Sequence, residues 1–200
     1  MKKGFKHLIF ILAGTAVISS FAGYTSSGGN NATTRSTQAA QPSIGNSLEL
    51  LNTVWAGYGE NDKFPAFGGD TADGNVKEGA PGIYNIDDSA SLNQVLGFPA
   101  DYADKIDNAA SLIHMLNSNT FTCGAFHLKN PEDSAAVAAA LKSNIMQRHW
   151  MCGFPDKLVV AATDDYIISF FGNDELIETF KSKLTTAYPS TKIISEDNID

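Results

Sequence analysis

The sequence predicts an α+β fold, in which a ferredoxin-like βαββαβ sandwich with an antiparallel four-stranded sheet and two helices follows an N-terminal helical extension. Three observations lead to this prediction. Residues 119–198 alternate between strand-like and helix-like patterns in that order. Residues 47–118 have apolar side chains at helical spacing on both sides of a long loop. About 150 residues follow the N-terminal region, which is enough for one domain with a sizeable core.

The segment before residue 119 is predicted to be mainly helical. Apolar residues recur at three- and four-residue intervals in 47–55, 88–96 and 101–117, and each segment is expected to form a helix. Between the first two helices, residues 57–82 are rich in Gly, Asp, Asn and Pro and are expected to form a long loop. Within this loop, Asp70–Asn75 is only a weak match to a calcium-binding loop.

The ferredoxin-like core, 119–198, has clearer local signals. Asn130 followed by Pro131 is typical of a helix start, and Gly153 and Pro155 are typical of a helix end. Two apolar runs around Asp164 are typical of a hairpin buried on both faces. In order, the predicted elements are a strand over 120–129, a helix over 131–151, strands over 158–162 and 166–171, a helix capped by Asn173, and a strand over 192–195.

The N-terminus has the pattern of a secretion signal. Lys2, Lys3 and Lys6 precede an uncharged, largely apolar run, and Ser20-Phe21-Ala22 resembles a cleavage site. We therefore expect residues 1–22 to be a signal peptide and the protein to be extracytoplasmic, either secreted or at the cell surface. The alternative is an uncleaved N-terminal anchor.

The residues after the signal bear on lipid anchoring. Phe21-Ala22-Gly23 is followed by Tyr24, where a lipobox would have a cysteine, and a phenol cannot receive the lipid that a thiol receives. Residues 23–46 consist mostly of Ser, Thr, Gly, Asn, Gln and Ala, a composition that favours a flexible tether. The segment is therefore typical of a lipoprotein, but Tyr24 argues against lipidation at this position.

Charge limits the classes of partner. Without the three signal-peptide lysines, 11 basic side chains remain against 22 acidic ones, a net charge of about −11. Such a charge disfavours nucleic acid and anionic membrane surfaces. We expect no cofactor, and as partner a small molecule, a peptide or an envelope protein, with membrane contact only through an N-terminal anchor.

Three stretches carry a similarity to known sequences: Thr122–Lys129, Gln147–Pro155 and Asp165–Ile168. The segment that contains them, about 119–184, resembles an uncharacterised family of predicted lipoproteins from Gram-positive anaerobes, known as a domain of unknown function. The resemblance implies an extracytoplasmic location. It implies no activity, because the family has no assigned catalytic residues.

Cys123 and Cys152 are the only cysteines, and in an exported chain a pair of cysteines favours a disulfide. The predicted helix over 131–151 is about as long as the strand it packs against, so its end should return Cys152 to the start of that strand, near Cys123. Closing this loop would contribute roughly 3–4 kcal/mol. Two reduced, buried thiols are the alternative.

A thiol or metal site is a functional alternative to a structural role for the two cysteines. Cys123, His149 and Cys152 could bind zinc or form a reactive thiol site, although no fourth ligand and no orienting group is evident. Cys123 and His127 are too far apart along one strand to share an ion.

The aromatic residues near the long loop could line a ligand groove or fill the core beneath the loop; they are Trp55, Tyr58, Phe64 and Phe67. Because no acid–base or nucleophile pairing stands out, the sequence favours an exported, non-enzymatic binding or accessory protein of the cell envelope. A thiol- or metal-dependent enzyme centred on Cys123, His149 and Cys152 is the competing interpretation.

Overall fold

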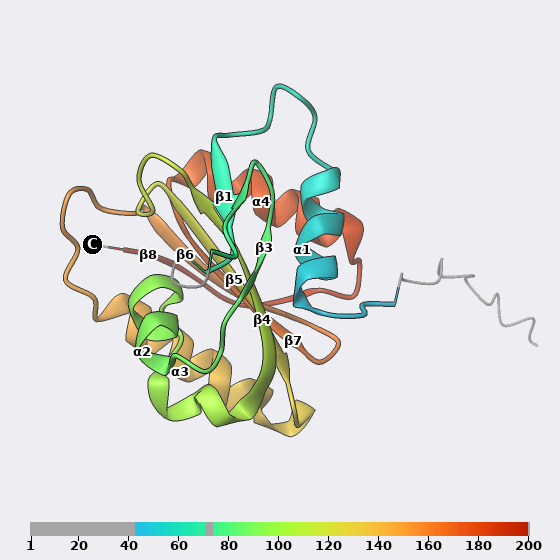
Figure 1. Cartoon of the computed structure of the whole chain (residues 1–200), viewed down its shortest axis with the longest axis vertical. Helices are drawn as coiled ribbons and strands as arrows, with labels where there is room; N and C mark the ends of the chain where they lie inside the picture. Colours follow the sequence, from blue (N-terminus) through green and yellow to red (C-terminus); the bar gives the residue numbers. More distant parts are fainter. Residues whose placement is uncertain (1–42, 71–73, 200) are drawn as a thin grey trace, which may run out of the picture. The chain divides into compact units, whose positions relative to one another are not determined.

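One antiparallel sheet organises the described part of the chain (Figure 1). The computed structural model describes residues 43–70 and 74–199, all within one compact unit. The predicted signal peptide, Tyr24, and the tether up to residue 42 lie outside the described residues. Among the described residues, no helix has both the length and the apolar character that crossing a membrane requires.

The structure has a mixed α and β composition, as predicted. The strands are β1 Ala66–Gly68, β2 Lys77–Glu78, β3 Gly82–Tyr84, β4 Ile106–His114, β5 Phe121–Leu128, β6 Lys157–Thr163, β7 Tyr166–Gly172 and β8 Lys192–Asn198. The α-helices are α1 Ser47–Ala56, α2 Ser89–Ser91, α3 Ser134–Met146 and α4 Asp174–Ala187. A π-helical turn, Leu92–Leu96, continues α2, and 3₁₀ turns occupy Ala100–Lys105 and Pro131–Asp133.

The sheet has eight strands, with the order β2-β1-β4-β5-β7-β6-β8, and β3 pairs with the same edge of β4 as β1 does. All of its pairings are antiparallel. The four-strand count predicted from the sequence is therefore too low. The segment 47–118, predicted to be a helical extension, contributes four strands to the same sheet and includes one helix of 10 residues.

Helices cover both faces of the sheet. The buried side chains of α1 and α4 share one apolar cluster with Cys123, Ala125 and other alternate residues of the central strands. Those of α3 and the π-helical turn share a second cluster with Phe126, Leu128 and the intervening residues. We call these two sides the α1/α4 face and the α3 face.

The two crossover connections explain this arrangement. The connection β5-α3-β6 passes across β7, and β7-α4-β8 passes across β6, so both step in the same direction along the sheet. Because β5 and β7 are antiparallel, two right-handed crossovers that step the same way place their helices on opposite faces. In a ferredoxin-like sandwich the second crossover steps back, and the last strand pairs with the first. Here β8 pairs with β6, so the observed order differs from the ferredoxin-like one.

The predicted helix over 101–117 is wrong, because Ile106–His114 forms the central strand β4. Leu112 lies in the apolar cluster of the α1/α4 face, and the next residue, Ile113, lies in that of the α3 face. A strand buried on both faces lacks the alternation of polar and apolar residues that identifies a half-buried strand. Its apolar residues also fall at helical intervals, which explains the error.

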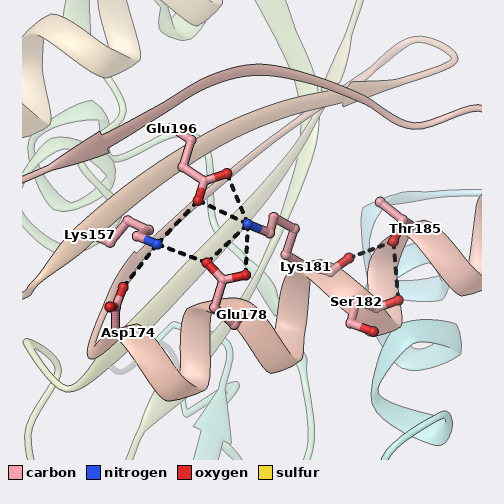
Figure 2. A network of polar contacts seen from close by, with 7 residues as sticks. All are labelled: Lys157, Asp174, Glu178, Lys181, Ser182, Thr185 and Glu196. Atoms are coloured by element: carbon pink, nitrogen blue, oxygen red, sulfur yellow. Dashed lines mark hydrogen bonds and ion pairs between the residues drawn. The ribbon is translucent and has the colours of Figure 1, made fainter.

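Ion pairs fasten the edge strand β8 to α4 (Figure 2). Nζ of Lys157, on β6, lies 3.0 Å from Asp174, 2.8 Å from Glu178 and 3.2 Å from Glu196. Nζ of Lys181 lies 2.8 Å from Glu178 and 2.9 Å from Glu196. Because Glu196 belongs to β8 and the other acids to α4, the two lysines join three elements.

Candidate functional site

The loop after α3 forms one wall of a polar cavity. Residues 147–156 connect α3 to β6 and lie against the β4–β5 connection, 115–120. Nδ2 of Asn117 donates a hydrogen bond of 3.1 Å to a backbone carbonyl of this loop, and Nδ2 of Asn119 donates two, of 3.0 and 2.9 Å. Side chains of one loop thus satisfy the backbone of the other, which gives the wall a defined shape.

The cavity has a volume of about 520 Å³, within the range of small-molecule sites. It lies between the π-helical turn, the β4–β5 connection, the loop after α3 and the end of β7. Its lining residues are mostly polar: Asn93, Gln94, Val95, Ser118, Asn119, Arg148, His149, Trp150, Met151 and Phe171.

Arg148 is held in place at this cavity. Its Nη2 donates hydrogen bonds to the carbonyl oxygens of Asn93 and of Gln94, the latter at 2.6 Å. Its guanidinium carbon lies 5.7 Å from the ring centres of both Trp150 and Phe171. The aromatic rings and two carbonyls of the π-helical turn therefore fix the orientation of the guanidinium. A guanidinium is suited to binding carboxylate or phosphate through two parallel N–H donors.

The positive charge of Arg148 has no carboxylate partner in the part of the chain that the structure describes. Among the described residues, none of the ion pairs includes Arg148. Burial lowers the pKa of its guanidinium from the ordinary value, yet arginine stays protonated at neutral pH because that value is so high. None of the ten lining residues is acidic, although the sequence has 22 acidic residues. The cavity is a cationic site in an acidic protein.

No disulfide joins Cys123 and Cys152 in the structure, and their pairing stays a prediction. Helix α3 ends at Met146, so Cys152 lies exposed in the following loop. Cys123 is fully buried on the α1/α4 face, whereas α3 covers the opposite face. The lengths of strand and helix say nothing of the face toward which Cys123 points, and that face is the one that α3 does not cover.

The same geometry separates the residues of the thiol or metal alternative. Cys123 is buried beneath α1 and α4, while His149 and Cys152 are exposed in the loop after α3. Within 43–70 and 74–199, no three His, Cys, Asp or Glu residues are close enough to hold a metal ion. Burial raises the pKa of the Cys123 thiol well above its ordinary value, which makes that thiol a poor nucleophile. The weak calcium match at Asp70–Asn75 includes residues outside the described part.

The four aromatic groove candidates divide between the two faces. Trp55, Tyr58 and Phe64 are in ring contact on the α1/α4 face, with Trp55 centred 4.7 Å from Tyr58 and 5.2 Å from Phe64. Phe67 packs on the α3 face and lines two small cavities there. The first three therefore pack in the core, and Phe67 is the candidate that lines a cavity.

The sequence patterns do not identify Arg148 as a site residue, although it lies within the stretch Gln147–Pro155. One signal was available. Arg148 is one of two arginines in the sequence, and it stands between Gln147 and the aromatic pair His149 and Trp150 in an acidic chain. The carbonyls that hold it, from Asn93 and Gln94, are more than 50 residues away, and only the fold brings them together.

Comparison with known proteins gives no functional assignment, so the proposed function depends on the geometry of the Arg148 cavity. No family model matches the chain, and no curated protein sequence or solved structure is significantly similar to it.

Proposed function

We propose that this chain is an exported, non-enzymatic binding protein of the cell envelope, and that its ligand is a small anion held in the Arg148 cavity. Export rests on the lysine-rich N-terminus and the apolar run that follows it. The binding site rests on the described residues alone.

The observation that carries the proposal is the unpaired guanidinium of Arg148 at a cavity without acidic lining residues. Taking a charge out of water costs free energy unless an opposite charge or hydrogen bonds compensate for it. Two backbone carbonyls compensate for part of that cost. An anion that enters the cavity would supply the missing countercharge and a bidentate acceptor.

Binding without catalysis is supported by the groups around the cavity. Ser118 and His149 both line it, but no hydrogen bond joins them among the described residues, and no described carboxylate orients His149. A nucleophile and its base need such contacts. The lining can therefore position an anion without activating a nucleophile.

The test compares anions with a matched cation on the full chain. Propanoate and inorganic phosphate are the anionic probes, propylammonium is the cationic one, and binding is followed by isothermal titration and by the melting temperature. We expect the anions to bind and to raise the melting temperature with concentration. Because a hydrogen bond to a charged group contributes about 1.5–3 kcal/mol, Arg148→Gln should lower anion affinity at least tenfold.

Lys63→Gln is the matched control, because it removes the same charge near Trp55, on the opposite face of the sheet. It should leave anion binding unchanged. The proposal is wrong if propylammonium binds as well as propanoate, or if Arg148→Gln binds both anions like the wild type while remaining folded.

A further inference from the structure

Two smaller cavities share lining residues with the Arg148 cavity or with each other. The first, of about 200 Å³, shares Val95 and Ser118 with the Arg148 cavity. The second, of about 280 Å³, shares Phe67 with the first. The three cavities therefore adjoin one another at these shared residues; we call them together the groove, and we call the position of Val95 and Ser118 its neck.

The chemistry of the groove changes along its length. Beyond the neck, the walls are largely apolar and include Phe67, Tyr84 and Ile113. The far mouth is lined by Val76, Met115, Phe67 and the exposed Glu78. The groove thus has a positive charge in its first cavity, largely apolar walls in the second and a negative charge in the third.

We infer that the anion bound by this protein is a monocarboxylate with an unbranched apolar chain. The inference rests on the proposed function, because it places the ligand's carboxylate at Arg148. The chain then passes between Val95 and Ser118 and reaches Phe67. Burying the chain in the apolar part of the groove supplies affinity that the charge pair alone does not.

Other anions fit the groove less well. Inorganic phosphate or acetate occupies the Arg148 cavity only and leaves the apolar part unused. A long dicarboxylate would bring its second carboxylate to Glu78 at the far mouth, where like charges repel. The two ends of the groove therefore select one carboxylate and one apolar end.

The experiment measures the dissociation constants of acetate, butanoate, hexanoate and octanoate for the full chain by isothermal titration, with octan-1-ol as the uncharged chain. Each added methylene should lower the dissociation constant about fourfold until the groove is filled. Octan-1-ol should bind at least tenfold more weakly than octanoate.

Two variants test whether the ligand's alkyl chain passes between Val95 and Ser118. Ser118→Phe, at an exposed loop position, and Val95→Phe both place a ring at the neck. Each should abolish the gain in affinity between butanoate and octanoate, whereas Ser118→Ala should keep that gain. Because the two variants lie on different elements, misfolding of one leaves the other as a test.

The failures of the two proposals are distinguishable. If all four carboxylates bind with equal affinity and Arg148→Gln abolishes their binding, the inference of an apolar alkyl chain is wrong. The proposed anion site at Arg148 is then still supported. If affinity rises with the length of the alkyl chain as steeply in Ser118→Phe as in the wild type, the alkyl chain does not pass the neck. The inference is again wrong. If octanoate binds as tightly to Arg148→Gln as to the wild type, both proposals are wrong.

Discussion

Nζ of Lys157 lies 2.8 Å from Oε1 of Glu178, and this ion pair joins strand β6 to helix α4. Lys181 contacts the same carboxylate from within α4. Hydrogen bonds from Lys157 and then Lys181 lower the pKa of Glu178 from 4.5 to about 2. The pair therefore links the stability of the α1/α4 face to pH.

Acid should weaken the protein through Glu178. Because its folded-state pKa is lowered, its contribution is present above about pH 4.5 and is lost as the pH falls toward 2. The carboxylate is half exposed, so we expect Glu178→Gln to lower the free energy of unfolding by only about 1 kcal/mol at pH 7, and by less at pH 3. Urea unfolding at both pH values measures this difference. Glu60→Gln, at an exposed site outside the ion-pair network, should have no such pH-dependent effect.

We expect the hydroxyl of Tyr58 to contribute nothing to stability. It is buried without a hydrogen-bond partner among the described residues, and burial raises its pKa. Tyr58→Phe should leave the free energy of unfolding unchanged or raise it by up to about 1 kcal/mol, because an unsatisfied polar group is removed.

Tyr84 provides the contrast, since its hydroxyl lies 2.7 Å from the hydroxyl of Ser91. Tyr84→Phe should cost about 1 kcal/mol. Equal losses for the two variants in chemical denaturation would show that Tyr58 has a partner.

Gly97 ends the π-helical turn that supplies the carbonyls for Arg148. Its φ is +74°, and an added Cβ would meet Cγ1 of Ile145 at 2.4 Å. Gly97→Ala should therefore lower the free energy of unfolding by about 2–3 kcal/mol, through backbone strain and overpacking together.

Gly79→Ala separates these two effects. Gly79 has a similar φ of +69°, but a Cβ there would meet no atom within 4 Å. It should cost only the strain, about 1 kcal/mol. If thermal denaturation gives the same loss for both variants, Ile145 does not pack against the turn as described.

The two cysteines should react with a thiol reagent at different rates. Cys152 is exposed, whereas Cys123 is buried with a raised thiol pKa. We expect one fast-reacting thiol per native chain and two in denaturant. Finding none in unreduced, denatured protein would instead establish the disulfide that the sequence favours.

The C-terminal half could be predicted from sequence because its signals are local. The strand predicted over 120–129 is β5 at Phe121–Leu128, and the hairpin around Asp164 is β6 and β7. The predicted helix after Asn173 is α4. The apolar runs give these elements their periods, and Asn130 and Pro131 mark the start of the 3₁₀ turn that leads into α3, without reference to the rest of the chain.

The order of strands and the site depend on distant residues. Whether β8 pairs with β5 or β6 is decided by the direction of the second crossover, and neither β7 nor α4 encodes that direction in its own periodicity. No local sequence pattern distinguishes Arg148 from other arginines that follow a helix. Its role depends on the π-helical turn, which only the fold places beside it. Short β1, β2 and β3 lack a period long enough to detect and become strands by pairing with a neighbour, as β1 and β3 do with β4.

The chain contains two tryptophans, and their indole N–H groups report on opposite faces of the sheet. Trp150 lines the Arg148 cavity, whereas Nε1 of Trp55 donates a 2.9 Å hydrogen bond to the carbonyl of Gly79. The ¹⁵N-labelled full chain is titrated with hexanoate and followed by NMR. The Trp55 indole signal then serves as the internal reference for the Trp150 indole signal. An anion bound at Arg148 predicts that the Trp150 indole signal moves saturably, that the Trp55 signal stays in place, and that neither moves in Arg148→Gln. A wild-type titration in which the Trp150 signal does not move, or in which both signals move equally, would contradict the anion site.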